Sequence, residues 1–187
     1  DRFPHHAIVF RSINVMEEYS CVKALKNNQF DLVATRQIFF TDPKNHQVFE
    51  SRLFKSDLKF LKLTDYELSD LDAGSKDELS KSLALYNSLY LDKYSTINPQ
   101  LNEKFIQLLA DQKVFKFKTL KKDGQIEGVV GHYSMYGTMI SPFFGYNIKV
   151  SEKVGLYRLL STILALEAKN SGEVFHQSSG ASFYKSI

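Results

Sequence analysis

The sequence predicts an α/β fold of the α+β kind, in which helices flank a mixed, mainly antiparallel central sheet. Phe115 and Phe117 alternate with Lys116 and Lys118, and residues 114–149 contain two glycine turns, which is typical of three antiparallel strands. A helical apolar pattern over 155–171 follows, and a short apolar run then ends at His176. This order of three strands, a helix and a further strand is the basis of the predicted fold.

Residues 1–55 predict an extra N-terminal strand–helix–strand unit. The apolar run 7–11 is short, and an Asn-x-x-Glu helix start opens the helix predicted for 14–27. The run 32–40 is rich in β-branched and aromatic residues and predicts a strand, which a second run at 48–54 is expected to pair with.

Residues 56–74 are charged and mixed and predict a connector, after which 75–187 forms the main domain. A capping box at Ser75 and Glu78 opens a helix whose apolar face is Leu79, Leu83, Tyr86 and Tyr90. Asn98 followed by Pro99 predicts the start of the next helix, with a buried face of Leu101, Phe105 and Leu108.

The three predicted strands are joined by two tight turns, at 122–125 and 135–138, and each turn contains a glycine. After Val150, Ser151 is the expected cap of the helix that runs to 171, and Gly172 is its expected end.

The order of these elements resembles the GCN5-related N-acetyltransferase (GNAT) superfamily, and most of all its Fem-like branch, in which two such folds lie in tandem. The family's Gln/Arg-x-x-Gly-x-Gly/Ala loop corresponds to Glu152–Arg158, where Gly155 is kept and Tyr157 replaces the second glycine. The later Asn…Ala…Phe-Tyr signature corresponds to Ser178 or Ser179, Ala181, Phe183 and Tyr184.

The resemblance implies that 75–187 is most of one GNAT-like domain, without its last strands. It also offers two readings of 1–55, as the tail of a first copy or as extra strands of one sheet. Because residues 1–4 hold neither a signal peptide nor an initiating Met, the chain is expected to be a fragment or a processed piece.

An acyl-CoA site is expected where the helix at Gly155 begins. Unpaired backbone N–H groups and the helix dipole attract a diphosphate, glycine permits close approach, and Arg158 adds charge. The resemblance adds a backbone edge for the pantetheine arm, and the predicted cofactor residues are Tyr146, Ile148, Val150, Val154, Gly155, Leu156, Tyr157, Arg158, Ser178 and Ser179. The alternative is an ordinary capped core helix beside a continuous sheet.

Acyl transfer to an amine also needs a base and an acid. No carboxylate lies in 139–148, so the candidate bases are Glu127 and His132, expected on opposite faces of one strand, and His176. The resemblance implies that Tyr184 is the general acid. The competing interpretations are a solvated glutamate, core histidines and a packing tyrosine.

Other functions are disfavoured. The net charge of +3 comes without a basic block, so nucleic acid is an unlikely partner, and one cysteine, Cys21, indicates a reducing, cytoplasmic compartment. No apolar stretch approaches the length of a membrane span, and the histidines lack metal-ligand spacing. Ser178 and Ser179 beside His176 lack the turn of a hydrolase nucleophile.

The sequence therefore predicts an acyl-CoA-dependent N-acyltransferase, with acetyl-CoA the first choice of cosubstrate, no metal, and a small-molecule or peptide amine as acceptor. A catalytically silent GNAT-like domain that binds a partner and a Fem-type aminoacyltransferase are the alternatives. Open sheet edges would favour a homodimer.

Overall fold

The computed structural model describes residues 4–10, 13–14 and 18–178, and the chain divides into two compact units, Asp1–Gln37 and Ile38–Ile187. The first unit contains helix α1 (Tyr19–Asn27), whose buried side chains are Val22 and Leu25. The strands predicted at 7–11 and 32–40 are wrong over the described residues 7–10 and 32–39, because apolar runs form a strand only where a partner strand supplies hydrogen bonds. Of the run 32–40, only Phe40 belongs to a strand, β1 (Phe40–Thr41).

The strand predicted at 48–54 is also wrong, since this run forms parts of helices α2 (His46–Glu50) and α3 (Arg52–Leu63). The Ser51 hydroxyl accepts a hydrogen bond from the Phe54 backbone N–H at 3.1 Å and caps α3. Most of α3 and all of strand β2 (Glu67–Asp70) lie in the segment 56–74, which had been predicted as a connector. The predicted domain boundaries at 55 and 75 stay predictions.

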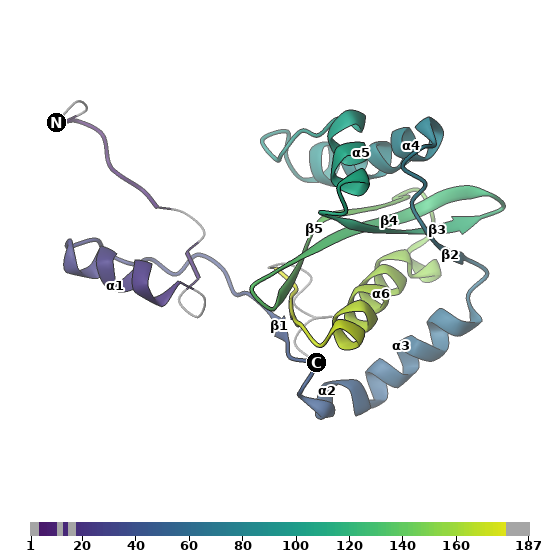
Figure 1. Ribbon diagram of the computed structural model, residues 1–187, viewed down its shortest axis with the longest axis horizontal. Helices are drawn as coiled ribbons and strands as arrows, with labels where there is room; N and C mark the ends of the chain where they lie inside the picture. The colour runs from purple at the N-terminus through teal and green to yellow at the C-terminus, as the bar shows by residue number, and fades with distance from the viewer. Residues whose placement is uncertain (1–3, 11–12, 15–17, 179–187) are drawn as a thin grey trace. The chain divides into compact units, whose positions relative to one another are not determined.

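The second unit is built on a six-stranded sheet, counted over its described residues, in the order β1–β6–β5–β4–β3–β2 (Figure 1). Its other strands are β1 (Phe40–Thr41), β3 (Lys116–Lys122), β4 (Gln125–Met135), β5 (Thr138–Tyr146) and β6 (Val174–His176). Every neighbouring pair is antiparallel except β5 and β6, which are parallel and joined by helix α6 (Leu156–Ser171). The predicted mixed, mainly antiparallel sheet is confirmed.

Both predicted hairpin turns are present. Asp123 and Gly124 have φ of 49° and 74°, and Tyr136 and Gly137 have φ of 51° and 78°. Two consecutive residues with positive φ form the tight turn whose twist matches that of antiparallel strands. These turns fix the register of β3, β4 and β5.

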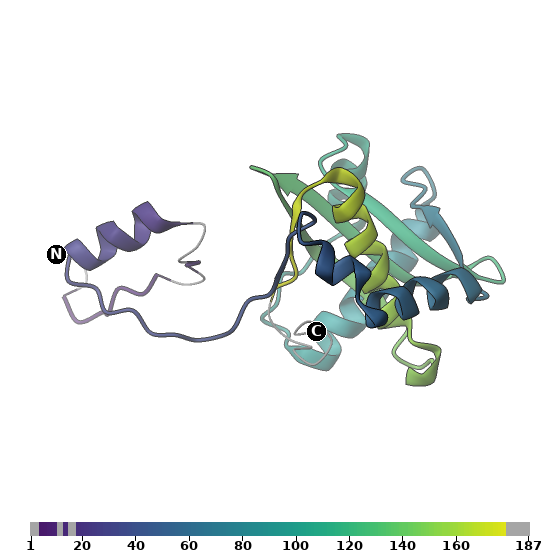
Figure 2. The same ribbon diagram turned by 90° about the horizontal axis from the view of Figure 1, so that it is seen from below.

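Helices cover both faces of the sheet (Figures 1 and 2). On one face lie α4 (Lys76–Asn87), the short π-helix η1 (Ser88–Tyr94) and α5 (Glu103–Asp111); on the other lies α6, with α3 packed against it. The Ser75 cap is confirmed, because its hydroxyl accepts a hydrogen bond from the Glu78 backbone N–H. The reciprocal bond of a capping box is not formed, since the Glu78 carboxylate accepts from the Asp72 N–H and the Ser75 N–H donates to the Asp72 carbonyl. Gly172, in the left-handed conformation, ends α6 as predicted.

Helix α5 corrects the prediction in both its start and its buried face. It is capped by Asn102 rather than Asn98, and Ile106 is fully buried. Phe105 and Leu108, predicted to point inward, are 44% and 54% exposed. Residues 98–101 are not helical, and the segment is tied down elsewhere, where the Tyr86 hydroxyl donates to the Pro99 carbonyl at 3.0 Å.

The core has one cluster on each face of the sheet. Leu159, Leu160 and Ile163 of α6 pack against one face. The packing is close, since a Cβ added to Gly128 would lie 3.2 Å from Cδ1 of Leu160. On the other face, Tyr86 and Phe143 centre the second cluster. Among the residues described, no helix combines the length and the apolar character that a bilayer crossing needs.

Candidate functional site

The parallel strands β5 and β6 part after three residues. Thr138, Met139 and Ile140 pair with Val174, Phe175 and His176, whereas β5 beyond Ile140 has no partner on β6 within the described chain. The chain after β6 instead continues along the β1 side, where the Gln177 N–H donates to the Phe39 carbonyl at 2.9 Å. The result is a fork between the two strands.

A β-bulge lies where the fork opens. Ser141 and Pro142 of β5 together oppose the single residue His132 of β4, so the ladder shifts by one residue. Proline has no N–H to give to a ladder, which explains why the extra residue occurs here. Beyond the bulge, Phe143 points into the α4 cluster and Phe144 toward α6.

Helix α6 begins beside this fork without a side-chain cap. Ser151 caps not α6, as predicted, but the separate turn η2 (Glu152–Val154). Gly155 has φ of 69° and connects the two, since its N–H donates to Glu152 and its carbonyl accepts from Leu159, both at 2.9 Å. The N–H groups of a helix's first turn have no partner within the helix.

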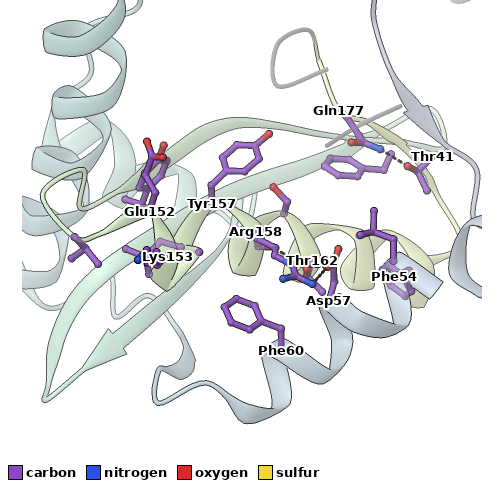
Figure 3. Close-up of a pocket in the computed structure, with 18 of the residues that line it drawn as sticks. Thr41, Phe54, Asp57, Phe60, Glu152, Lys153, Tyr157, Arg158, Thr162 and Gln177 are labelled. Carbon is purple, nitrogen blue, oxygen red and sulfur yellow. Dashed lines mark hydrogen bonds and ion pairs between the residues drawn. The ribbon is translucent and has the colours of Figure 1, made fainter. Parts of the chain in front are cut away.

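A pocket of about 650 Å³ lies between the end of β5, the first three turns of α6, helix α3 and β6 (Figure 3). We call it the fork pocket. Its volume is within the range of small-molecule sites. Seven of the predicted cofactor residues line it: Tyr146, Ile148, Val150, Gly155, Leu156, Tyr157 and Arg158. Val154 packs on the α6 cluster instead, Ser178 is not part of the lining, and Ser179 lies outside the described residues.

Helix α3 forms a wall of the fork pocket that the sequence did not predict. Its Asp57 carboxylate accepts from Nε of Arg158 at 2.5 Å and from the terminal guanidinium nitrogen at the same distance. That terminal nitrogen also donates to the Ser56 hydroxyl at 3.0 Å. Arg158, expected to attract a phosphate, is therefore already paired with a carboxylate.

Phe60 of α3 covers the start of α6. Its ring lies under the Arg158 guanidinium at 4.8 Å, and a Cβ added to Gly155 would lie 2.9 Å from the ring. Figure 3 shows Phe60 and Asp57 directed from α3 toward α6, between the Lys153 end of the pocket and Phe54. The signal that could have found α3 is the Ser51 cap with apolar residues at helical spacing after it.

Tyrosines from three elements form the rim of the fork pocket. Tyr94 comes from η1, Tyr146 from the end of β5, and Tyr157 from the first turn of α6. Burial raises the pKa of Tyr146, and the neighbouring Tyr94 and Glu152 raise it further. The Tyr146 phenol is therefore neutral near pH 7 and is a hydrogen-bond donor. A π-helix such as η1 is frequent at functional sites.

The candidate bases do not gather in the fork pocket. His132 is 3% exposed and lines a different pocket of about 340 Å³. Its Nε2 lies 3.9 Å from the Glu167 carboxylate, and neither ring nitrogen has a hydrogen-bond partner among the described residues. Burial lowers the pKa of His132, although Glu167 opposes this, so the ring is neutral at pH 7.

Glu127 lies one residue away from the fork pocket. Its carboxylate accepts from the side-chain amide of Asn147 at 2.6 Å, and Asn147 lines the pocket. Glu127 is also the extra residue of a bulge in β4 opposite β3. Because of this extra residue, Ile126 and Val129 lie on the same face of the sheet. The prediction that Glu127 and His132 lie on opposite faces assumed strict alternation along β4, which the bulge interrupts.

His176 is held by its neighbours at the end of β6. Its Nδ1 accepts a hydrogen bond from the Ser178 N–H at 3.1 Å, and its ring meets Phe40 edge-on at 4.9 Å. It is not part of the pocket lining. Tyr184, the expected acid, lies outside the described residues. No cluster of metal-ligating side chains is present in 4–10, 13–14 or 18–178.

No protein-family model and no curated protein matches the chain, but solved structures do. L-PGS from Bacillus licheniformis matches with a TM-score of 0.64 and 13% identity, over 84% of this chain and 49% of the other. A conserved protein of unknown function from Bacteroides thetaiotaomicron matches with a TM-score of 0.61 and 10% identity, over 87% and 58%.

The C-terminal domain (DUF2156) of a putative lysylphosphatidylglycerol synthetase from Agrobacterium fabrum matches with a TM-score of 0.56 and 10% identity, over 78% and 47%. The chain thus spans about half the length of these structures. Acetyltransferases also match, with TM-scores below 0.5. At these identities the likeness shows the fold alone, and the fold class predicted from the order of elements, a mixed, mainly antiparallel sheet flanked by helices, is confirmed. The GNAT superfamily and its Fem-like branch stay predictions.

Proposed function

We propose that this chain is an acyltransferase that holds a thioester donor in the fork pocket and passes the acyl group to an amine. The observation that carries the proposal is the pocket itself, which lies where β5 and β6 part and beside the uncapped start of α6. A sheet that stayed continuous between β5 and β6 would have left no room for a donor.

The residues of the pocket would hold the arm of the donor along its length. The edge of β5 beyond Ile140 is free of β6 within the described chain, and Tyr146 at its end lines the pocket, so the backbone there would be available to an amide of the arm. The Asn147 side chain is fixed by Glu127. In the transfer, the amine nitrogen bonds to the acyl carbon, the carbon–sulfur bond breaks, and the proton lost by nitrogen leaves with the thiol.

Acyl-CoA, the predicted cosubstrate, fits this site only in part. Its pantetheine arm suits a pocket that extends from Gly155 to Ala165 of α6, which is about 15 Å at the helical rise. Its diphosphate does not suit the first turn as arranged here, because Phe60 lies on Gly155 and Asp57 is bound to Arg158. No step of the reaction is assigned to the diphosphate.

A second candidate is aminoacyl transfer from an ester donor. An aminoacyl ester brings no diphosphate to α6, and two of the similar structures are described as L-PGS or as a lysylphosphatidylglycerol synthetase domain. The modest net charge of +3 gives no support to an RNA-bound donor. A cytoplasmic location, a homodimer and a small-molecule or peptide acceptor stay predictions.

The test is thiol release from acyl thioesters with a panel of amines, together with thermal unfolding. A donor at 100 times its Kd stabilises the fold by about 2.7 kcal/mol. Ala165→Leu places a larger side chain in the pocket and should weaken donor binding. Ala84→Leu, the same change at an exposed position of α4, is the matched control.

The second candidate would be favoured if no thioester gave stabilisation or thiol release while an aminoacyl ester released its amino acid. No response to either donor class would leave a catalytically silent domain.

A further inference from the structure

We propose that the fork pocket selects a thioester whose pantetheine arm ends in no more than a single phosphate, and that α3 excludes the diphosphate of CoA from the start of α6. This inference rests on the proposed acyl transfer in the fork pocket. It names the donor class for that site and identifies Asp57 and Phe60 as the residues that set it.

The first argument is steric. A glycine at the start of the helix leaves space for a ligand to approach the backbone. Here that space is filled from α3, since a Cβ on Gly155 would lie 2.9 Å from Cε1 and 3.1 Å from Cζ of Phe60. Phe60 and Leu61 are also packed on the α6 core cluster, so the ring is anchored by the helix that carries it.

The second argument concerns Arg158. Its Nε and one terminal nitrogen are both bonded to Asp57, and that terminal nitrogen also reaches Ser56. The Asp57 side chain is 19% exposed, so solvent screens this pair only in part. A diphosphate would bring negative charge next to the Asp57 carboxylate, and its gain from Arg158 would be offset by that repulsion.

The third argument is the charge of the whole lining. The cations that line the pocket are Lys93, Lys153 and Arg158, and the anions are Asp57 and Glu152, which leaves one net positive charge. Glu152 belongs to the turn that leads into α6, where a diphosphate would have to lie. One positive charge matches a single phosphate group at the end of a pantetheine arm better than the diphosphate and ribose phosphate of CoA.

The remainder of the pocket suits the arm. The Thr162 hydroxyl donates to the Arg158 carbonyl at 2.8 Å, so its oxygen is left to accept from an amide N–H of a ligand. Phe54 of α3, Tyr157 of α6 and Phe175 of β6 supply apolar surface in the same pocket. An arm of alternating methylene and amide groups requires this mixture.

The experiment compares three donors that carry the same acetyl group: acetyl-pantetheine, acetyl-4′-phosphopantetheine and acetyl-CoA. Each is assayed for kcat/KM by thiol release with one accepted amine. The expected result is a kcat/KM for acetyl-4′-phosphopantetheine at least tenfold above that for acetyl-CoA. Asp57→Asn and Phe60→Ala should each reduce this ratio at least threefold, by opening the start of α6 to the diphosphate.

Asp65→Asn and Leu63→Ala are the matched controls, because both residues are exposed, near α3, and outside the pocket lining. They should leave the donor ratio unchanged. Asp57→Asn keeps the side-chain shape and remains informative even if Phe60→Ala fails to fold.

A higher kcat/KM for acetyl-CoA than for acetyl-4′-phosphopantetheine in the wild-type protein would overturn the inference while leaving acyl transfer intact. An unchanged donor ratio in both α3 variants would overturn the role of Asp57 and Phe60. Absence of transfer from all three donors would instead count against the proposed function. An acetylated carrier protein, added as a fourth donor, identifies the source: faster transfer than from the free arm indicates a carrier protein, and slower transfer a free phosphopantetheine.

Discussion

On the face of the sheet that α4 covers, aromatic rings pack against one another, whereas on the α6 face aromatic rings surround a pocket. Tyr86 stacks on Tyr90 at 4.7 Å and on Phe143 at 4.9 Å, and Phe117 meets Phe143 edge-on at 5.4 Å. The neighbouring residue Phe144 points to the other face and contacts Tyr157 at 5.4 Å.

The difference comes from the backbone and not from the types of side chain. Below α4, β4 and β5 are paired along their length, so the helix rests on a continuous surface. Below the start of α6, β5 has left β6, so the sheet is not continuous there among the described residues. A pocket therefore arises wherever a helix extends past the paired part of a sheet and a second helix, here α3, closes the side.

The largest effect should come from truncating an aromatic ring on the packed face. Tyr86→Ala is expected to lower the free energy of unfolding by about 3–5 kcal/mol, because two stacked rings lose their partner. Tyr157→Ala, on the pocket face, should cost less, about 1–2 kcal/mol, because Tyr157 is only half-buried. Urea unfolding of both variants measures this. Equal losses would mean that Tyr157 is a core residue.

The second effect is a pH dependence of stability that arises where the two faces meet. Burial raises the pKa of Tyr90 to about 12, and Tyr86, Tyr94 and Tyr157 nearby contribute. The unfolded phenol ionises near pH 10 while the folded one keeps its proton, so stability is fully present below pH 10 and falls as the pH rises toward 12.

Two pH units correspond to about 2.7 kcal/mol. Wild-type protein should therefore lose about 2–3 kcal/mol more between pH 9 and 12 than Tyr90→Phe, in denaturant titrations at each pH. Subtracting the loss of Tyr90→Phe from that of the wild-type protein removes the contribution of the other tyrosines. Parallel losses in the two proteins would show that the Tyr90 phenol is solvated in the folded state.

The sheet and its helices could be predicted from the sequence because their signals are local. The glycine turns at Gly124 and Gly137, the Ser75 cap and the Gly172 stop each act within a few residues. The Gly155 signal before an apolar helix is local as well, and seven of the residues predicted to bind a cofactor line the fork pocket, although their binding role stays a prediction.

The remaining features depend on contacts between distant residues. The pairing of Asp57 with Arg158 joins positions 101 residues apart, and no local pattern indicates it. The strand predicted at 32–40 had the right composition but lacked a partner over most of its length. The bulge at Glu127 changes which residues share a face, and only the register between strands reveals it.

A third effect compares two glycines, one facing each side of the sheet. Gly145→Ala should cost about 1–3 kcal/mol, because the new Cβ would lie 2.6 Å from the Tyr86 backbone nitrogen, which cannot move without α4. In Gly128→Ala the new Cβ would lie 3.2 Å from the end of the Leu160 side chain, which can rotate, and at an ordinary contact distance of 3.5 Å from the Leu120 Cβ, so its cost should be smaller. Thermal unfolding of the two variants gives the order, and the reverse order would mean that α6 is packed more rigidly than α4.

The smallest effect should come from His132, a buried group with no hydrogen-bond partner in the described chain. Burial lowers its pKa, while Glu167 and Glu173 oppose this and Lys116 and Lys118 reinforce it. Because the folded pKa lies below the usual value of 6.5, the unfolded state takes up a proton first, and stability falls as the pH drops below about 6.5.

His132→Leu should abolish this loss at acid pH and change stability at pH 8 by less than about 1 kcal/mol, since no hydrogen bond of the ring is broken. Denaturant unfolding at pH 8 and pH 5 gives both quantities, and His132→Gln serves as a polar control of similar size. A loss of transfer activity in both variants with unchanged stability would contradict a purely structural His132 and would connect its pocket to the fork. Unchanged activity would leave the two pockets on the α6 side of the sheet independent of each other.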